Sequence, residues 1–319
     1  MKRIAVVTSG GDAPGMNACI RAIVRSAVYQ DLTVFGVNRG YYGLIYHDFI
    51  SLNVNSVGDI IHRGGTILRT SRAKEFREES MRIRAKEALQ YFGVKNLIVI
   101  GGNGSLAGAY ELSKLGVNVI GIPASIDNDV PGTENAIGFD TAVNTVLDAI
   151  NRIRDTATSH ERIFIIEVMG RKSGQIALAA GLAGGAESIL VPEIPYDLSN
   201  VVERINAGIA RGKLHSIIVV AEGCCSAMVL GQEIEKLSQQ ETKVTVLGHT
   251  QRGGMPTASD RILASRMGKK AVDLVLEGFT NKMVAMQGNQ LVAIDIADVV
   301  QGSREIDWTE YELARILSI

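Results

Sequence analysis

Two aspartates, Asp127 and Asp129, lie two positions apart just after an apolar run that ends at Ile122. Carboxylates at this spacing can divide the work of a reaction, because one can take a proton from a substrate hydroxyl while the other holds a metal ion. A polar turn after a strand is the alternative, since Asp and Asn are ordinary turn residues. The spacing alone leaves both interpretations open.

Two glycine-rich loops favour the chemical interpretation. Ser9-Gly-Gly-Asp12 and Ile100-Gly-Gly-Asn103 each follow a predicted strand and lead into a predicted helix. Backbone N–H groups and a helix N-terminus at such a loop can face an anion. Neither loop is a Walker motif or a Gly-x-Gly-x-x-Gly fingerprint. Together with the carboxylates at a third strand end, they indicate a ligand crevice at the carboxyl edge of a parallel sheet.

The elements that position these residues follow from the hydrophobic pattern. Helical spacing of apolar residues predicts helices over 15–29 and 140–156. Alternation of strands and helices predicts parallel sheets covered on both faces. The segments 131–133 and 251–254 are the candidate crossings between domains. Short apolar runs predict buried strands at Ile4–Val7, Val34–Val37, Leu97–Ile100, Val119–Ile122, Ile163–Val168, Ile217–Ala221 and Val244–Leu247.

Composition narrows the class of protein. The chain has 319 residues, 34 Gly and a net charge of -1, so nothing indicates a nucleic-acid or membrane partner. Cys19, Cys224 and Cys225 lack metal-ligand spacing, and we interpret them as small core or loop residues of a protein from a reducing compartment. We expect no signal peptide and no bilayer-spanning segment, and therefore a cytoplasmic protein.

Seven longer motifs carry a family resemblance. They are Thr8–Asn17, Ile126–Asp129, Ile137–Thr141, Arg154–His160, Glu167–Arg171, Gly248–Gly254 and Asp260–Ser265. With these motifs the chain resembles the bacterial ATP-dependent 6-phosphofructokinases almost from end to end. The resemblance implies an α/β fold of two doubly wound domains with mainly parallel sheets and an active site in the interdomain cleft. It implies a nucleotide-binding domain at 1–138 plus 252–304 and a sugar-phosphate-binding domain at 139–251 plus 305–319.

The same resemblance implies the activity, which is transfer of the γ-phosphoryl group of ATP to the 1-hydroxyl of fructose 6-phosphate. This glycolytic kinase reaction would use Mg²⁺ and give fructose 1,6-bisphosphate. A homotetramer is implied, with ADP as an activator and phosphoenolpyruvate as an inhibitor. Gly104 and Ala124 favour ATP as the donor, since pyrophosphate-using relatives carry Asp and Lys at these two positions.

The resemblance also assigns roles to residues. Asp127 would be the base, Asp129 and Asn103 would lie near Mg²⁺, and Arg72 and Arg171 would offset charge on the transferring phosphoryl group, with Ser125 beside them. The implied ATP contacts are Gly11, Tyr41, Arg72, Ala73, Phe76, Arg77, Gly102, Asn103, Gly104, Ser105 and Gly108. The implied sugar-phosphate contacts are Ser125, Ile126, Asp127, Arg162, Met169, Gly170, Arg171, Glu222, Lys243, His249, Thr250, Gln251 and Arg252, of which Arg162 and Lys243 would reach a neighbouring subunit. The implied effector site holds Arg21, Ala22, Ile23, Val24, Arg25, Asp59, Arg154, Gly185, Ala186, Glu187, Arg211, Lys213, Leu214 and His215.

Structural roles remain open for several of these residues. His249 could be a buried, hydrogen-bonded histidine with a purely structural role. Arg162 could be an ordinary surface cation, and Glu222 could cap the end of a strand. Tyr41 and Phe76 fit plain core residues. For Arg21 and Arg25, which share a helix face, the alternative is a solvated surface.

The chain departs from the family pattern near the reacting groups. Asn103 stands where the family has an aspartate, so Mg²⁺ binding should weaken. Lys243 replaces an arginine and loses its bidentate fork. Leu214 replaces a frequent lysine, Ser125 a threonine, and Ala73 and Ala124 a cysteine and a glycine. These changes keep two rival functions open: a catalytically weak ligand-binding or regulatory paralogue, and a kinase for a related sugar phosphate such as tagatose 6-phosphate.

Overall fold

The computed structural model describes residues 2–160 and 162–318 and divides the chain into two compact units. The first unit is 1–125, 129–140 and 252–304, and the second is 126–128, 141–251 and 305–319. One crossing therefore falls inside the 251–254 candidate, whereas 131–133 lies within the first unit. A short excursion at 126–128, which the sequence did not predict, places Asp127 in the second unit and Asp129 in the first.

In the described part of the first unit, seven strands form one sheet in the order β11-β10-β5-β4-β1-β2-β3. All neighbours are parallel except at the two edges, where β3 and β11 run antiparallel. The four strands predicted here are confirmed, and β3, β10 and β11 were missed. The strands are β1 (Arg3–Thr8), β2 (Thr33–Val37), β3 (Phe49–Leu52), β4 (Asn96–Gly101), β5 (Asn118–Pro123), β10 (Lys282–Gln287) and β11 (Gln290–Asp295).

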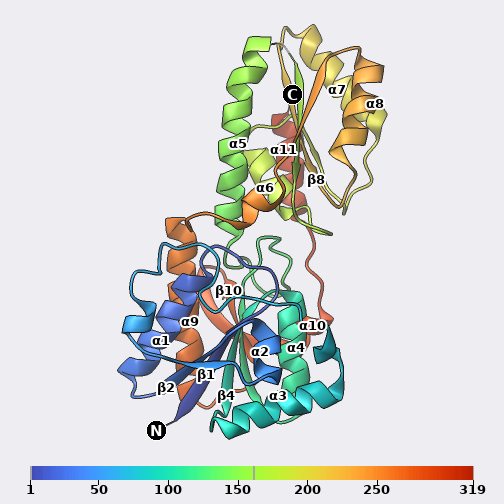
Figure 1. The fold of residues 1–319 in the computed structure, drawn as a ribbon. Helices are drawn as coiled ribbons and strands as arrows, with labels where there is room; N and C mark the ends of the chain where they lie inside the picture. The colour runs from blue at the N-terminus through green and yellow to red at the C-terminus, as the bar shows by residue number, and fades with distance from the viewer. Residues whose placement is uncertain (1, 161, 319) are drawn as a thin grey trace. The chain divides into compact units, whose positions relative to one another are not determined.

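Helices cover both faces of this sheet (Figure 1). α1 (Met16–Tyr29) and α9 (Ala258–Leu276) pack together on one face. Gly268 permits their close approach, because a Cβ there would lie 2.9 Å from the Cys19 carbonyl oxygen. The other face carries α2 (Gly40–Ile45), α3 (Glu79–Tyr91), α4 (Asn103–Lys114) and α10 (Ile296–Gln301). Two 3-10 turns, η1 (Asn55–Val57) and η2 (Lys74–Arg77), lie in the connections.

The second unit has a smaller parallel sheet in the order β7-β8-β6-β9. Its strands are β6 (Ile163–Val168), β7 (Ser188–Leu190), β8 (Ser216–Ala221) and β9 (Thr242–Val246). The three-residue β7 was not predicted, and β9 begins two residues before the predicted run. α7 (Leu198–Ala210) and α8 (Ala227–Ser238) pack on one face, while α5 (Phe139–His160), α6 (Gln175–Ala183) and α11 (Trp308–Leu317) cover the other (Figure 1). The 3-10 turn η3 (Gly248–Arg252) follows β9.

Both sheets gather polar loops at their carboxyl edges. In the first unit β2 lies on one side of β1 and β4 lies on the other. The β1/β4 pair is therefore a topological switch point of the sheet. The Ser9 N–H donates to the Ile100 carbonyl there, at 3.0 Å. In the second unit the Glu222 N–H donates to the Val168 carbonyl, at 2.8 Å, which joins the loops after β6 and β8.

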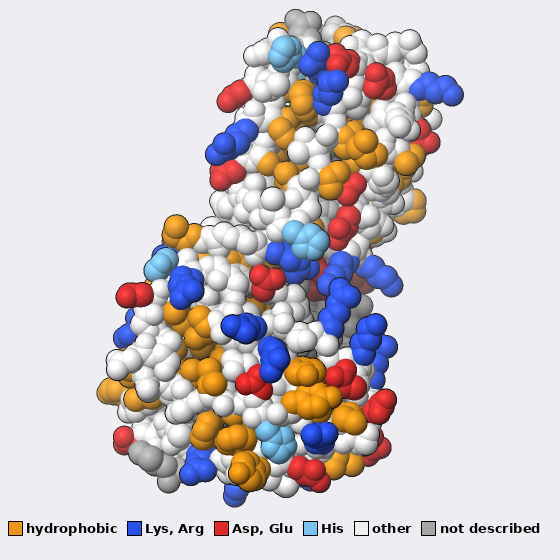
Figure 2. Space-filling model, viewed as in Figure 1, with side chains coloured by type: hydrophobic (Ala, Val, Ile, Leu, Met, Phe, Trp, Pro, Cys, Tyr) orange, Lys and Arg blue, Asp and Glu red, His pale blue; other side chains and the backbone are white. Residues whose placement is uncertain are grey.

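The visible surface of each unit mixes charges. In Figure 2 Lys and Arg side chains lie among Asp and Glu side chains on both units. Among the described residues, none of the helices is long and apolar enough to cross a lipid bilayer.

Candidate active site

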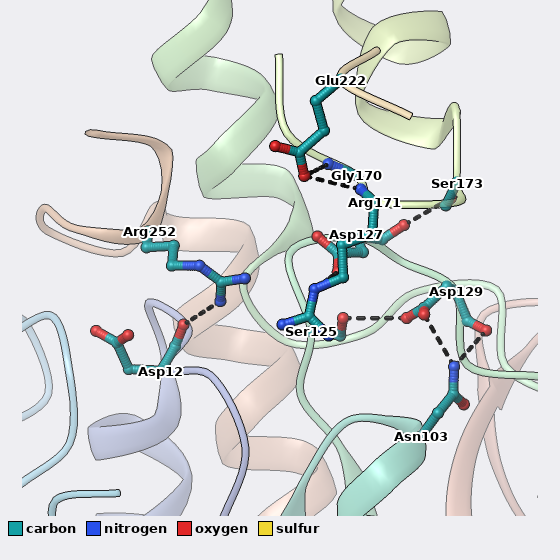
Figure 3. Close-up of polar contacts among 10 residues, drawn as sticks. All are labelled: Asp12, Asn103, Ser125, Asp127, Asp129, Gly170, Arg171, Ser173, Glu222 and Arg252. Carbon is teal, nitrogen blue, oxygen red and sulfur yellow. Dashed lines mark hydrogen bonds and ion pairs between the residues drawn. The ribbon is translucent and has the colours of Figure 1, made fainter. Parts of the chain in front are cut away.

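In the first unit the loop after β5 meets the start of α4. The Asn103 side-chain amide donates to Asp129 Oδ2 at 2.9 Å and to the Asp129 carbonyl at 3.1 Å, and the Ser125 hydroxyl donates to Asp129 Oδ1 at 3.1 Å (Figure 3). Gly102 is the N-cap residue of α4. The sequence motifs therefore bring a carboxylate, an amide, a hydroxyl and a helix N-terminus to one place.

These groups match part of the coordination of a magnesium ion, with a bound ligand supplying the remaining oxygens. Within the described parts of the chain, no cluster of three or more His, Cys, Asp or Glu side chains could hold a metal alone. Mg²⁺ commonly binds one or two carboxylates and takes its remaining oxygens from substrate phosphates and water. The Asp129 carboxylate and the Asn103 amide oxygen match that partial donor set. Asn103 supplies an oxygen there without a negative charge.

Arg304 is a neighbour of this group that the sequence did not reveal. Its guanidinium donates to the carbonyls of Thr133 and Glu134. Burial lowers the pKa of Arg304, and the nearby Asp129 carboxylate acts in the opposite direction. The residue belongs to no motif, so only the folded chain could identify it.

A pocket opens beside the α4 N-terminus. It encloses about 410 Å³, a volume within the range of small-molecule sites. Its lining is Asn103, Gly104, Ala107, Val299, Val300 and Gly302. A Cβ at Gly104 would meet nothing within 4 Å, so this position borders open space.

Tyr41 and Phe76 pack beneath this loop as core residues. Their rings stack at 4.1 Å between centroids, and each residue is 6% exposed. The Tyr41 hydroxyl donates to the Ser105 carbonyl, and a Cβ at Gly108 would lie 2.7 Å from the Tyr41 ring. These two aromatic residues therefore pack as core residues, and they support the first turn of α4.

The remaining predicted cations of the first unit are exposed or lie over glycine. The Arg252 guanidinium lies against Gly11, where any Cβ would collide with it. Arg252 Nη1 donates to the Asp12 carbonyl at 3.4 Å (Figure 3). Arg72 and Arg77 are exposed at either end of the 72–77 segment, and Ala73 packs on the core cluster.

In the second unit Asp127 is buried beside Arg171. Asp127 is 4% exposed, and its Oδ2 lies 3.8 Å from Arg171 Nε. The Ser173 hydroxyl donates to the Asp127 carbonyl at 3.0 Å (Figure 3). The Asp127 backbone is thus held by Ser173, while an exposed cation faces the carboxylate.

Glu222 fixes the turn that carries Arg171. Arg171 has φ 55° and Gly170 has φ 146°, and left-handed backbone at a non-glycine residue persists only where the surroundings enforce it. Glu222 Oε1 accepts the N–H groups of Gly170, at 3.3 Å, and of Arg171, at 3.0 Å (Figure 3). A Cβ at Gly223 would collide with the Arg171 carbonyl, so the turn after β8 packs directly on this turn.

The turn after β9 is built around Gln251. This side chain is fully buried, accepts the Met169 N–H at 3.2 Å and donates to the Gly248 carbonyl at 3.0 Å. Thr250 donates to the Leu247 carbonyl at 2.6 Å. His249 is exposed, which excludes the buried-histidine alternative.

Arg162 and Lys243 meet on one carboxylate. Glu241 accepts from Arg162 Nε at 2.6 Å and pairs with Lys243 Nζ at 2.7 Å, because β6 and β9 are adjacent. The two cations lower the pKa of the exposed Glu241 carboxyl, Lys243 more than Arg162. Sequence reasoning paired the two cations by family likeness and missed the glutamate between them.

The second-unit part of the predicted effector site forms one cluster. Glu187 pairs with Lys213 and accepts the Ile217 N–H, while Arg154 donates to the Gly184 carbonyl next to Gly185. Burial, with the charges of Arg154 and Lys213, lowers the pKa of His215. Arg211 and Leu214 are exposed nearby in the chain, and Ala186 is buried.

The first-unit members of that prediction lie on α1 and after η1. Ala22, Ile23 and Val24 are buried in the core, whereas Arg25 and Asp59 are exposed and Arg21 is partly exposed. Ala124, which replaces a glycine of the family pattern, bridges to Ile137 and is not among the described residues with positive φ.

Comparisons with known proteins agree with this arrangement. A family model described as phosphofructokinase matches residues 3–275. Proteins named ATP-dependent 6-phosphofructokinase from Natranaerobius thermophilus and Halalkalibacterium halodurans are 56% and 55% identical to the chain, each over the full length of both chains. The T-state crystal structure of Pichia pastoris phosphofructokinase covers 99% of this chain with a TM-score of 0.89 and 35% identity, and the chain spans 38% of that longer one. The predicted α/β fold with mainly parallel sheets is confirmed.

Proposed function

Because this chain belongs to the phosphofructokinase family, we propose that it transfers the γ-phosphoryl group of ATP to the 1-hydroxyl of fructose 6-phosphate. The observation that carries the proposal is the buried Asp127 carboxylate beside Arg171, in a chain that matches ATP-dependent 6-phosphofructokinases over its full length. Phosphoryl transfer needs positioning and charge compensation more than covalent chemistry from the protein.

On the acceptor side, Asp127 would take the proton of the sugar hydroxyl. Its carboxylate is buried and its backbone is held by Ser173, so the base has a fixed position. Arg171 lies within reach of the same carboxylate and would stabilise negative charge on the transferring phosphoryl group. Glu222 would keep that arginine's backbone in place and leave its side chain free to follow the phosphate.

The sugar phosphate itself would be held by cations. Arg252, Arg162, Lys243 and the exposed His249 supply positive or hydrogen-bonding groups suited to a phosphate ester. That Arg162 and Lys243 act on a neighbouring subunit's substrate is part of the proposal. The ion pairs of these two cations with Glu241 would have to break when a phosphate binds.

On the donor side, the α4 N-terminus and the space at Gly104 would receive the nucleotide. Backbone N–H groups at a helix start attract phosphate oxygens. Asp129 and the Asn103 oxygen would hold Mg²⁺, which supplies charge neutralisation between phosphate oxygens when bound. Ser125 and Arg304 would keep Asp129 oriented. The predicted cleft between the domains, and the domain names themselves, stay predictions.

A coupled assay of ADP formation tests the function directly. Purified protein with ATP, Mg²⁺ and fructose 6-phosphate should form ADP and fructose 1,6-bisphosphate. Pyrophosphate in place of ATP should support little turnover, since Gly104 leaves room for a nucleotide. Absence of ADP formation above background would reject the kinase proposal and support a ligand-binding paralogue. A higher kcat/KM with tagatose 6-phosphate would reassign the substrate; the relatives' names give no support to that alternative.

Assembly and regulation complete the proposal. We propose a homotetramer, in keeping with the closed symmetry of most soluble oligomers, in the cytoplasm where glycolytic substrates are used. The cluster of Arg154, Glu187, Lys213 and His215 would bind ADP as an activator and phosphoenolpyruvate as an inhibitor. Phosphoenolpyruvate should then raise the half-saturating fructose 6-phosphate concentration, and Arg154→Ala should weaken that response. Saturation curves unmoved by either ligand, or a fully active monomer in sedimentation, would contradict this part alone.

A further inference from the structure

Glu193 is a partly buried carboxylate in the loop after β7, and none of the roles proposed above uses it. It belongs to none of the family motifs in the sequence. Its Oε1 accepts the Gly174 N–H at 2.8 Å, and its Oε2 accepts the same N–H at 3.1 Å. A hydrogen bond to a carboxylate is roughly twice as strong as one between neutral groups. Glu193 is therefore a charged anchor for the backbone at Gly174.

Gly174 is the point where this anchor meets a helix. It is the N-cap residue of α6 and has no side chain of its own to cap that helix. The positive end of the helix dipole favours a carboxylate at this position. A Cβ at Gly174 would collide with the Val191 side chain, so the loop after β7 packs directly against the loop after β6. The glycine thus permits the close approach that brings the Glu193 carboxylate to the start of α6.

The residue before this anchor point holds the proposed base. Ser173 is 8% exposed, and its hydroxyl donates to the Asp127 carbonyl at 3.0 Å (Figure 3). The Ser173 N–H donates to the Gly170 carbonyl at 2.8 Å, which closes the turn on itself. These residues, Gly174 and Glu193 all belong to the second unit. A displacement of Gly174 would therefore move Ser173 and its hydrogen bond to the Asp127 backbone.

The turn after β6 is consequently held by a carboxylate at each end. Glu222 accepts N–H groups at its start, including that of Arg171. Glu193 accepts an N–H group at its end, next to Ser173. The start of the turn carries the Arg171 side chain, whereas its end contacts Asp127. The two glutamates therefore hold different members of the pair formed by Asp127 and Arg171.

We propose that Glu193 is a positioning residue, which holds the Asp127 base in place through Gly174 and Ser173. The role in catalysis rests on the proposed function, in which Asp127 is the base, whereas the anchoring of the turn is independent of any reaction. A base acts only within hydrogen-bonding reach of the proton that it removes, and small displacements reduce the rate strongly. Loss of the anchor should therefore slow the chemical step more than it weakens binding of the sugar phosphate.

Steady-state kinetics test the effect on the base. In Glu193→Ala, kcat should fall about tenfold, the scale expected for loss of a hydrogen bond to a charged group. The half-saturating fructose 6-phosphate concentration should change by about twofold or less, because the substrate contacts remain. Glu193→Gln keeps an acceptor oxygen and should recover most of kcat, and the exposed Glu235→Ala on α8 is the matched control. Equal losses in the Ala and Gln variants, or a loss confined to half-saturation, would overturn the positioning role.

A double-mutant cycle separates positioning from general destabilisation. In the Ser173→Ala background the connection to Asp127 is already broken, so Glu193→Ala should lower kcat further by about twofold or less. In the Asp127→Asn background, where the base is absent, Glu193→Ala should leave the residual rate unchanged. A smaller folded fraction would instead lower the rate by the same factor in every background. The same loss of kcat in the Ser173→Ala background as in the wild type would therefore overturn the connection through Ser173.

Hydrogen exchange tests the anchor without reference to activity. In the full-length protein the amides of 172–175 should exchange faster in Glu193→Ala than in the wild type, while those of β8 should be unchanged. Unchanged exchange at 172–175 would overturn the anchor. Faster exchange at 172–175, in a protein whose wild type forms no ADP, would retain the anchor and would reject the proposed function together with the positioning role.

Discussion

Around Asp127 in the second unit, contacts within the protein fix the backbone of the site, whereas around Asn103 in the first unit the hydrogen-bonded polar groups also border an open pocket. Glu222 accepts two backbone N–H groups of the Arg171 turn, and Ser173 holds the Asp127 backbone. By contrast, Gly104 faces nothing within 4 Å, and Arg72 and Arg77 are exposed.

This difference separates two kinds of site. The Asp127 region is a prebuilt site, which the protein orders before substrate binds, and the Asn103 region is a ligand-completed site, whose charges come partly from the bound ligand. A base acts only when correctly oriented, so contacts within the protein fix beforehand the backbone of Asp127 and the backbone of the turn that carries Arg171. A polyphosphate and its metal bring their own charges, so the region that receives them needs space, N–H groups and few side chains. Four substitutions test this contrast.

The largest effect should come from Asp127→Asn. The amide keeps the shape of the side chain and cannot accept the proton, so turnover should fall about 10²–10⁴-fold. The half-saturating fructose 6-phosphate concentration should change by only a small factor, measured in the ADP-coupled assay. Asp148→Asn, at an exposed position on α5, is the control. Near-normal turnover in Asp127→Asn would show that Asp127 is not the base.

Glu222→Ala should have the second largest effect. It leaves two N–H groups of a left-handed turn without their charged acceptor. A loss of roughly 1.5–3 kcal/mol, typical of hydrogen bonds to charged groups, corresponds to a decrease of about 10–100-fold in kcat/KM. Glu222→Gln retains an acceptor oxygen and should recover much of the loss. The exposed Glu203→Ala serves as control. Equal losses in the Ala and Gln variants would show that the carboxylate contacts substrate and that its support of the Arg171 turn is secondary.

Asn103→Asp tests the ligand-completed site. A second carboxylate beside Asp129 should lower the Mg²⁺ concentration for half-maximal activity about tenfold or less, because charge on the ligands strengthens metal binding. Binding of Mn²⁺ in the presence of ATP, followed by electron paramagnetic resonance, gives a readout independent of turnover. Asn151→Asp, exposed on α5, adds the same charge elsewhere. Identical metal affinity in Asn103→Asp and the wild type would place residue 103 away from the metal.

Lys243→Arg should have the smallest effect. It supplies a bidentate fork at an exposed position where Glu241 already competes, so fructose 6-phosphate half-saturation should fall by about fivefold or less, roughly 1 kcal/mol. Lys269→Arg, which keeps its pairing with Asp273, is the control. Weaker sugar-phosphate binding in Lys243→Arg would indicate that Glu241 holds the arginine more tightly than the substrate can.

The sequence determined the strands, the glycine-rich loops and the motif residues, because periodicity and turn chemistry are local properties. The runs at Ile163–Val168 and Leu97–Ile100 became β6 and the centre of β4. It missed β10 and β11, although each carries a short apolar run, and their pairing at the sheet edge identifies them as strands. The excursion at 126–128 was also missed, since no composition change marks it.

Contacts between distant segments were decided by the tertiary structure alone. Glu241 between Arg162 and Lys243, Arg304 near Asp129, and Glu222 beneath Arg171 arise from strand order and loop packing, which residue types by themselves do not encode. The sequence could name Cys224 and Cys225 as small residues without a metal pattern. The contact of Gly223 with the Arg171 carbonyl exists only because the fold packs the turn after β8 against the turn after β6.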